Sequence, residues 1–396
     1  MRFLLIVFVF GVFLFTSCAN ESDPTADKAA FTRIYDNDRF DASFYPIDMK
    51  QTPDGGYLIL GGRRIQDSNF TGIYLMKTDE FGAYVSEMEV DETYVNPVGP
   101  LLENGGNYYF FGMTSTGLQT QLFQLDAEGT LSDPISVGGT YPAAAAVDGS
   151  NFLLLSYDNL NKLSVVSVVN PAGSVIKSKG FSIGAGDAAE EPIINHFLRT
   201  GTPLPFIVGK TPTGQYFFNG FYNYTLSLVF TDLQNDNPQG VVQGQQDDGG
   251  LSQVVPQEGG KFALARFNFG DNYYLPNTTL NTTGISSSTD LGGNPFPELV
   301  DNAPVKILRL TVNAKKIVLY GSNTRNNQIA VYGYDEATGE FLGSRYLGFS
   351  NSFEIASITP TADGGLGVCG TTHVAGRFPR ICLFKLSQEQ LIESFQ

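Results

Sequence analysis

The sequence predicts an all-β protein, a seven-bladed β-propeller built from four-stranded antiparallel blades. Short apolar or β-branched runs alternate with turns rich in Gly, Asp and Pro, as in Gln51–Gly82. This unit recurs, with variations, as far as the C-terminus. The segment that contains it, residues 30–396, exceeds the about 250–300 residues that one core usually supports. Its core is therefore expected to be built by repetition.

Each unit is expected to have four strands, named a to d from the innermost to the outermost. Two sets of turns give independent counts of these units. The a–b turns are PDGG near Gly55, ENGG near Gly105, DGSN near Gly149, PTGQ near Gly214, QEGG near Gly259, VNAK near Ala314 and ADGG near Gly364. The c–d turns are TDEFG (78–82), LDAEG (125–129), VNPAG (169–173), TDLQNDNPQG (231–240), LNTTG (280–284), YDEATG (334–339) and LSQEQ (386–390). Both counts give seven, and a period near 50 residues is typical of propeller blades.

The innermost strands are expected to be short runs of small or branched residues, with almost no helix outside the N-terminal leader. These a strands are Tyr45–Met49, Val98–Leu102, Ala143–Val147, Phe206–Val208, Ser252–Val255, Ile307–Val312 and Ile355–Ile358. A propeller must also close its ring so that no strand edge stays exposed. Two segments are candidates for the closing outer strand, Phe31–Tyr35 and Gln390–Phe395.

The N-terminus has the features of a secretory signal. Arg2 precedes an apolar run, Phe3–Phe15, which is shorter than the about 20 residues of a membrane-spanning helix. The following Phe15-Thr16-Ser17-Cys18 resembles the bacterial lipobox, with Phe in place of the usual Leu. The resemblance implies cleavage before Cys18 and acylation of that residue, while the alternative is an ordinary signal with an incidental cysteine. We therefore expect a lipoprotein signal peptide over residues 1–17 and a lipidated flexible tether over residues 18–29.

The residues after the cysteine bear on location. Ala19, rather than Asp, follows Cys18, which in the resembled lipoproteins favours the outer membrane over the inner one. The acidic stretch Glu21–Asp23 resembles surface-export signals of Bacteroidetes lipoproteins. We expect a protein anchored by lipid in the outer membrane, with the cell surface favoured over the periplasmic side.

Charge and cysteine content limit the possible partners. Loss of residues 1–17, which include Arg2, leaves 24 − 1 = 23 basic against 40 acidic residues, a net charge of −17. So acidic a chain repels phosphate backbones, and no nucleic-acid partner is expected. Cys369 and Cys382 fall on successive strands of the last unit and could face each other, as a disulfide or as two buried thiols.

The first unit carries the most specific resemblance in the chain. Gln51-Thr52-Pro53-Asp54-Gly55-Gly56-Tyr57 with Tyr74–Asp79 resembles the QTxDGGY…YLxKxDxxG propeller repeats of secreted and surface proteins from Bacteroidetes and some archaea. The last unit keeps the pattern in Pro360–Gly365 and Ile381–Lys385, and the middle units keep only its spacing. The resemblance implies a propeller fold and a role outside the cytoplasm, but no catalytic residues.

No catalytic, metal or cofactor site is expected. His196 and His373, the two histidines, lie in no metal-binding or nucleophile motif and are interpreted as polar loop residues. The acids that recur in turns are expected to form those turns: they are Asp54, Asp79, Asp126, Asp335 and Asp363. Non-repeating acids are better catalytic candidates, but no partner base accompanies them: Asp187, Glu190, Glu191, Asp247, Asp248 and Asp271.

A binding site is expected on the face that carries the b–c and d–a connections, because these vary in length while the other turns are short. We call it the b–c face. Its longest connection, Gly184–Pro205, accounts for a step of 65 residues between units and is expected to be ordered and accessible. The candidate binding residues are Asp187, Glu190, Glu191, His196 and Phe197 in this insertion, with Tyr222, Tyr224, Tyr273 and Tyr274 in or beside other irregular loops.

These features predict a non-catalytic lipoprotein that acts as a scaffold and binds a protein partner. By analogy with the resembled lipoproteins, that partner is an outer-membrane transport or secretion complex. The alternative is a propeller that binds or cleaves carbohydrate. The absence of Trp weakens that alternative, since flat aromatic platforms usually bind sugars, whereas the abundant Tyr and Phe support it. A concave pocket that combines Tyr222 or Tyr273 with two close acids would favour glycan chemistry.

Overall fold

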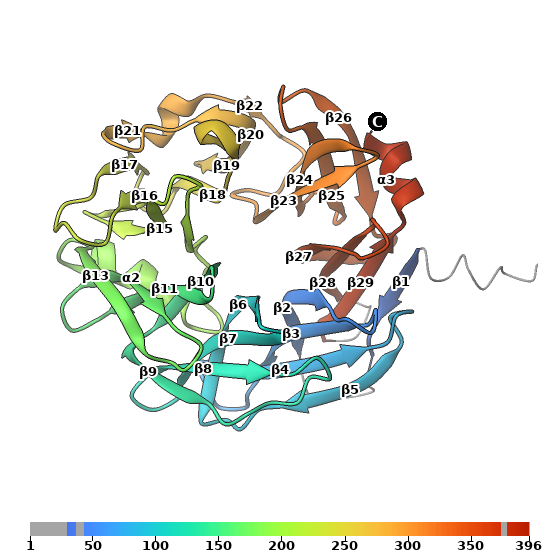
Figure 1. Ribbon diagram of the computed structural model, residues 1–396, viewed down its shortest axis with the longest axis horizontal. Helices are drawn as coiled ribbons and strands as arrows, with labels where there is room; N and C mark the ends of the chain where they lie inside the picture. Colours follow the sequence, from blue (N-terminus) through green and yellow to red (C-terminus); the bar gives the residue numbers. More distant parts are fainter. Residues whose placement is uncertain (1–29, 37–42, 374–377, 396) are drawn as a thin grey trace, which may run out of the picture.

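The computed structural model describes residues 30–36, 43–373 and 378–395, and its sheets lie side by side in a ring (Figure 1). One eight-stranded sheet contains β2 (Phe44–Gln51), β3 (Tyr57–Arg64), β4 (Thr71–Thr78), β5 (Tyr84–Glu89), β6 (Tyr94–Asn104), β7 (Asn107–Thr114), β8 (Gln119–Leu125) and β9 (Ile135–Thr140). It consists of two four-stranded halves, β2–β5 and β6–β9, which are joined by the pair Gly72–Val95.

The remaining sheets follow in chain order around the ring. They contain β10 (Pro142–Asp148), β11 (Asn151–Asp158), β12 (Leu163–Val169) and β13 (Val175–Ser182); β14 (Ile207–Lys210), β15 (Tyr216–Tyr222), β16 (Thr225–Thr231) and β17 (Gly240–Gln243); β18 (Gly249–Pro256), β19 (Lys261–Asn268), β20 (Asp271–Thr279) and β22 (Asn294–Pro295); β23 (Val305–Val312), β24 (Lys315–Asn323), β25 (Ile329–Asp335) and β26 (Phe341–Leu347); and β27 (Ser352–Pro360), β28 (Leu366–His373) and β29 (Arg380–Leu386) with β1 (Phe31–Ile34). Every expected a strand is confirmed as the innermost strand of its unit.

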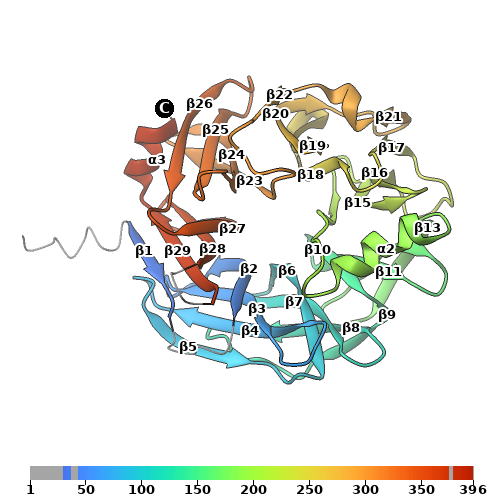
Figure 2. The same cartoon turned by 180° about the vertical axis from the view of Figure 1, so that it is seen from behind.

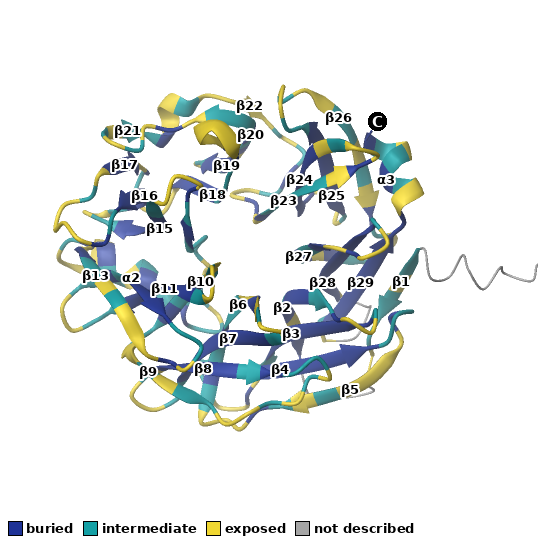
Figure 3. Ribbon diagram, in the orientation of Figure 1, coloured by how far each residue is buried: buried dark blue, intermediate teal, exposed yellow. Residues whose placement is uncertain are grey.

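Apolar clusters between neighbouring sheets hold the ring together. The cluster between β2–β5 and β6–β9 includes Leu60 and Phe110, and the one between the first and last sheets includes Met49 and Leu383. The middle strands are therefore buried on both faces, whereas outer strands such as β5 and β13 are largely exposed (Figure 3). This accounts for continuous apolar runs, rather than alternation, in the second and third strands of each unit.

The ring is closed by the N-terminal candidate. β1 pairs with β29 from Phe31–Lys385 to Ile34–Cys382, so a strand from the start of the chain completes the last sheet. The C-terminal candidate is instead a helix, α3 (Gln388–Phe395). Figure 2 shows β1 and α3 near each other from behind.

Helix α3 is one of two short α-helices in the described part of this all-β fold, and its position was not expected. Ser387 and Gln390 form reciprocal side-chain to backbone bonds of 3.2 Å, a capping box that the sequence already contained. Leu391 and Phe395, four residues apart, are fully buried. Phe395 lies over two glycines that face each other on neighbouring strands, Gly333 and Gly343. A Cβ atom on Gly333 would lie 2.4 Å from the Phe395 ring, and one on Gly343 would lie 2.1 Å from the Ser394 carbonyl oxygen, so only glycine fits at either position. The expected c–d turn LSQEQ (386–390) thus leads into a helix.

The insertion between β13 and β14 contains a second unexpected helix, α2 (Asp187–His196). Ala189, Ile193 and Phe197 recur every four residues and are buried in a cluster that also contains Tyr157 and Phe221. This spacing is the helical signal that turn counting missed. The insertion is ordered, as expected, but its apolar face belongs to the core.

The fifth unit departs from the simple repeat. After β20 the chain pairs as β21 (Ile285–Ser287) in parallel with β17 of the preceding sheet, before β22 returns to β20. The turn LNTTG (280–284) therefore starts a crossover to the neighbouring sheet rather than a c–d hairpin. The short helix η2 (Ser288–Leu291) connects β21 to β22, and η1 (Glu258–Gly260) forms the a–b turn of this unit.

The two cysteines do not face each other. Cys369 pairs with Leu383 and Cys382 with Gly370, so their side chains lie on opposite faces of the last sheet. Both are free and buried, Cys382 towards the β23–β26 sheet and Cys369 towards the first sheet. Burial raises the pKa of both thiols. The disulfide alternative is wrong for this arrangement.

The repeat motif has a structural explanation. The buried Lys77 ammonium donates to Asp54 at 2.8 Å and to Thr52 at 3.0 Å, and Lys385 donates to Asp363 at 2.9 Å. Burial raises the pKa of the Asp54 carboxyl, but hydrogen bonds from Lys77, Thr52 and Gly56 outweigh it, lowering this pKa to about 2. A Lys near the end of the third strand therefore anchors the Asp of the a–b turn within the same unit.

The interpretation of the recurring acids as turn formers is confirmed. Each accepts a backbone N–H within its own turn: from Gly56 to Asp54, Ala83 to Asp79, Thr130 to Asp126, Thr338 to Asp335 and Gly365 to Asp363. Asp accepts such bonds because its short side chain positions an oxygen two to four residues ahead. These carboxylates therefore already accept backbone hydrogen bonds that hold their own turns.

Candidate functional site

The inner strands of all the sheets surround a central channel of about 830 Å³. Strands β2, β6, β10, β14, β18, β23 and β27 each contribute lining residues. Small side chains such as Ala143 and Ala144 on β10 leave it open. The segment from His196, the last residue of α2, to Phe206 borders the channel on the b–c face.

The channel is basic although the chain is strongly acidic. Its lining includes three cationic side chains, Lys50, Arg199 and Lys306, and one carboxylate, Asp48. Asp48 is 7% exposed, and its Oδ2 accepts the Leu101 N–H at 2.8 Å. The carboxylate is therefore partly committed to the backbone of β6, and the channel retains an excess of positive charge.

Lys306 is the most unusual of these cations. Burial lowers the pKa of its ammonium, and the negative charge of Asp48 partly opposes that shift. Among the described residues its Nζ has no hydrogen-bond or ion-pair partner. Its side chain is partly exposed, so its charge lies at the channel wall without a described counter-ion.

The segment after α2 is tied to the opposite side of the channel rim. The Asn96 side chain on β6 donates to the Phe197 carbonyl oxygen at 2.7 Å. The Arg199 backbone N–H donates to Asn69 O at 2.7 Å, in the loop between β3 and β4. This segment therefore bridges the rim on the b–c face.

His196 is not the loop residue that we expected. It is the last residue of α2, and its Nδ1 accepts the Leu204 N–H at 2.8 Å, so that Nε2 carries the hydrogen of the neutral ring. Its ring packs against Phe197 and Phe206, with centroid distances of 4.9 and 4.6 Å. Burial lowers the pKa of His196 to about 4.

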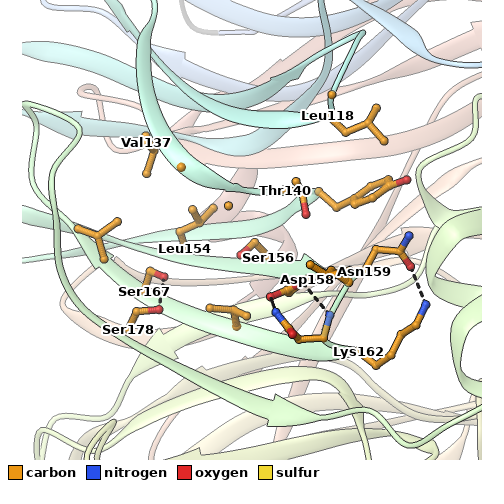
Figure 4. Close-up of a pocket in the computed structure, with 18 residues that line it drawn as sticks. Leu118, Val137, Thr140, Leu154, Ser156, Asp158, Asn159, Lys162, Ser167 and Ser178 are labelled. Carbon is orange, nitrogen blue, oxygen red and sulfur yellow. Dashed lines mark hydrogen bonds between the residues drawn. The ribbon is translucent and has the colours of Figure 1, made fainter.

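A second cavity of about 850 Å³ lies between the outer strand β9 and the β10–β13 sheet (Figure 4). Its polar side chains are bonded to one another: Lys162 donates to Asn159 at 3.0 Å, and the Ser167 and Ser178 hydroxyls are 3.0 Å apart. Lys162 also pairs with Glu190 of α2. Because Lys162 is paired with Glu190 and Asp158 accepts hydrogen bonds from Leu160 and Asn161, this cavity is a weaker candidate than the channel.

The predicted binding residues of the insertion differ in their accessibility. Asp187 and Glu191 are exposed on α2, and Glu190 pairs with Lys162. Phe197 is 5% exposed and packs in the core, which corrects its assignment to an accessible surface.

The four tyrosines that were predicted to bind a partner also differ in their exposure and surroundings. Tyr274 lies within β20, 5% exposed, with its ring 4.5 Å from that of Tyr320, so its assignment to an irregular binding loop is wrong. Tyr273, its neighbour on β20, lies under the guanidinium of Arg266 at 3.7 Å. Tyr222 ends β15 and borders a cavity of about 410 Å³, and Tyr224 is 46% exposed at the tip of the β15–β16 hairpin.

The arrangement specified for a glycan site does not occur around Tyr222. The described residues that line its cavity include Asn237, Gln239 and Thr283 but no carboxylate. Nor does any group of three or more His, Cys, Asp or Glu in the described part of the chain have the geometry to hold a metal ion. His373, the other histidine, ends β28 with its Nε2 3.6 Å from Glu354.

Three exposed apolar side chains lie on the b–c face, of which sequence reasoning singled out Tyr224 and missed Leu160 and Phe269. Leu160, Tyr224 and Phe269 are 89%, 46% and 66% exposed, and each lies at the tip of the b–c hairpin of one of three consecutive sheets. Tyr224 and Phe269 have positive φ angles of 72° and 47°. Large apolar residues in turns, where Gly or Asn is usual, were the available signal.

Comparisons with known proteins identify no relative in sequence. The chain matches no protein-family profile and no curated protein. Its fold is similar to a protein of unknown function from Bacteroides caccae, at 11% identity over 88% of this chain and 91% of that one, with a TM-score of 0.35. It is also similar to prolyl oligopeptidase B from Galerina marginata (10% identity, 89% of this chain, 51% of that one, TM-score 0.45).

A third similar structure is dihydro-heme d1 dehydrogenase NirN in complex with DHE, at 12% identity over 87% of this chain and 73% of that one, with a TM-score of 0.41. Identities this low transfer no activity. The fold is all-β and propeller-like on its own sheet topology. Among the helices of the described residues, none is long and apolar enough to cross a membrane.

Proposed function

We propose that the protein is a seven-bladed β-propeller, anchored in the outer membrane by lipid on Cys18, that binds a protein partner without catalysis. The blade count is supported when the halves β2–β5 and β6–β9 are taken as separate blades beside the five other sheets. The surface side of the membrane is favoured by the resemblance of the tether to export signals. The b–c face is the proposed interface.

The observation that carries this proposal is the set of apolar hairpin tips, which we define as Leu160, Tyr224 and Phe269. Each belongs to a different one of three adjacent sheets, so exposed apolar side chains recur on one face of the ring. A left-handed conformation disfavours bulky residues by about 1–2 kcal/mol relative to glycine. Phe269 adopts it while 66% exposed, so folding does not explain this side chain, whereas the Tyr224 ring is about half exposed and also packs over Gly184. Exposed aromatic anchors are typical of protein interfaces.

Replacing all three hairpin tips by Asn is expected to abolish partner recovery while preserving stability. Asn tolerates positive φ, so Tyr224→Asn and Phe269→Asn relieve strain rather than add it. Affinity purification after cross-linking in native membranes, quantified by mass spectrometry, should show about tenfold less of the specific partner, which is the size of a hot-spot loss.

The matched control substitutes exposed apolar residues on outer strands: Val85→Thr, Ile176→Thr and Phe341→Thr. Partner recovery by the control protein should stay within about twofold of wild type, because outer strands lie away from the proposed face. Equal recovery by the hairpin-tip variant and wild type would place the interface elsewhere.

The anchor lies outside the described residues and has its own test. Cys18→Ala is expected to move the protein from the membrane fraction to the soluble one, since the acyl chains would hold this acidic domain on lipid. Fractionation with and without a high-salt wash distinguishes an anchor from attachment through a partner. Continued pelleting after the wash would contradict lipidation at Cys18.

A further inference from the structure

We propose that the central channel binds a small organic anion, with its charged group at Lys306 and its apolar part against the wall formed by Leu308 and Ile358. This site is separate from the proposed protein interface, because it lies inside the ring rather than on the hairpin tips. The central channel, which has no part in the proposed protein interface, is thereby given a class of ligand.

The pairing of the other lysines carries the argument. In the described part of the chain, half-buried or buried lysines elsewhere have polar partners. Pairs with a carboxylate include those of Lys77 with Asp54, Lys179 with Asp236, Lys210 with Asp148 and Lys385 with Asp363. Lys177 donates to the backbone carbonyl oxygen of Asp232. Among the described lysines, only Lys50, Lys261 and Lys306 have no polar partner within the described residues, and Lys261 is exposed to solvent. The fold thus supplies acceptors for its lysines wherever they are half-buried, except in the channel.

A group on the ligand is the natural acceptor for Lys306. Asp48 attracts this ammonium but forms no ion pair with it among the described residues, and one of its oxygens accepts the Leu101 N–H. Arg199 has one bond from Nε, at 3.4 Å to the Ser68 carbonyl oxygen, which leaves its positive charge uncompensated. An anion would therefore meet net positive charge in a partly desolvated site, where charge pairing is stronger than in water.

A second observation points to a missing polar group. The Ser357 hydroxyl on β27 lines the channel, is only 5% exposed, and has no hydrogen-bond partner among the described residues. Buried polar groups are nearly always bonded. The neutral His196 ring, whose Nε2–H is also without a described partner, adds a donor at the rim. With three cationic side chains against one carboxylate, the channel has net positive charge, which suits an anionic ligand.

Size and polarity define the ligand further. A volume of about 830 Å³ lies within the range of small-molecule sites, about 300–1,000 Å³. The wall includes apolar residues from several strands, namely Ile47, Val98, Ile207, Leu308 and Ile358. These features fit an amphipathic carboxylate or phosphate ester better than an inorganic ion.

Lys306 rather than Lys50 is assigned to the charged group. Lys306 is the second residue of β23, and Lys50 is the seventh residue of β2. Lys306 is six residues before the end of β23, whereas Lys50 is one residue before the end of β2 and so near its a–b turn, which places Lys306 nearer the b–c face. Only the Lys306 end is close to His196 and Arg199 on the rim.

Isothermal titration calorimetry of the mature chain with 2-naphthoate tests the proposal, with neutral 2-naphthamide as the matched ligand control. We expect saturable binding of the acid and affinity for the amide at least about tenfold lower, the usual loss when a charged hydrogen bond is removed. Lys306→Gln should weaken binding of the acid by about tenfold or more. Lys261→Gln, which removes the same charge from an exposed position, should change it less than about twofold.

Stability separates a binding role from a structural one. Because Lys306 has no described hydrogen-bond or ion-pair partner, Lys306→Met removes no such contact and should unfold at the same or a higher guanidinium concentration than wild type without ligand. Three results would overturn the proposal: no saturable binding of 2-naphthoate, equal affinity for acid and amide, or equal effects of Lys306→Gln and Lys261→Gln. A lower unfolding midpoint for Lys306→Met would make Lys306 a structural residue and overturn it as well.

Discussion

A protein that begins at Asn37 is expected to be less stable than one that begins at Ala30 by about 3 kcal/mol or more, because it lacks the strand that closes the ring. β1 supplies the outer strand of the last sheet, and its Phe31 ring packs at 6.2 Å on Tyr57 of the first sheet. Tyr35, just after β1, donates from its hydroxyl to Gly82 O at 2.9 Å. Partial exposure of several large apolar side chains at about 1.5–3 kcal/mol each gives this magnitude.

The truncation should also change association. Without β1, the edge of β29 presents unpaired N–H and C=O groups, which favour edge-to-edge pairing between molecules. Guanidinium unfolding followed by circular dichroism measures the stability, and analytical ultracentrifugation measures the association. The protein that begins at Ala30 is the control, since it lacks the same tether but keeps β1. Equal unfolding midpoints for the two would mean that the ring does not depend on this closure.

Acidification from pH 6.5 to pH 4 is expected to remove about 3 kcal/mol of folding free energy through His196. Burial lowers the pKa of this ring to about 4, whereas the unfolded chain binds its proton near pH 6.5. Between these values the unfolded state binds more protons, so stability is fully present above pH 6.5 and falls as the pH falls towards 4. A difference of about 2.5 pKa units at 1.36 kcal/mol each gives the magnitude.

The matched variants are His196→Asn and His373→Asn. Asn at position 196 offers an oxygen near the place of Nδ1, which accepts the Leu204 N–H, so the bond can persist without a titrating ring. Unfolding free energies measured from pH 4 to 8 should lose most of their slope in His196→Asn only. The lowered pKa values of Asp54 and Asp363 act mainly below pH 4 and stay outside this window. Identical slopes in both variants and wild type would refute the assignment.

The internal repeat was the part of the fold most accessible to sequence reasoning. Turn chemistry is local: Asp54, Asp79 and Gly55 act within a few residues, so their spacing located the innermost strands correctly. The two helices were missed because the search followed turns. Their signals, the capping box at Ser387 and Gln390 and the spacing of Ala189, Ile193 and Phe197, were present in the sequence.

The candidate site was less accessible, because it is made by residues from distant units. No spacing relates Lys306 to Asp48 or Arg199, which belong to other parts of the ring. The predicted face did include the hairpin tips, yet Leu160 and Phe269 drew no attention as single residues in polar loops. Conversely, Phe197 and Tyr274 looked accessible, although packing between elements buries both.

The sequence by itself determined the repeating strand–turn pattern, the acidic charge and the expected signal at Cys18, since each depends on neighbouring residues or on composition. Only the tertiary structure decided that β1 closes the ring, that Cys369 and Cys382 lie on opposite faces, and that Lys306 has no described partner. Those properties depend on strand register and on which sheets become neighbours. Both are set by long-range packing, where a shift of one residue sends a side chain to the other face.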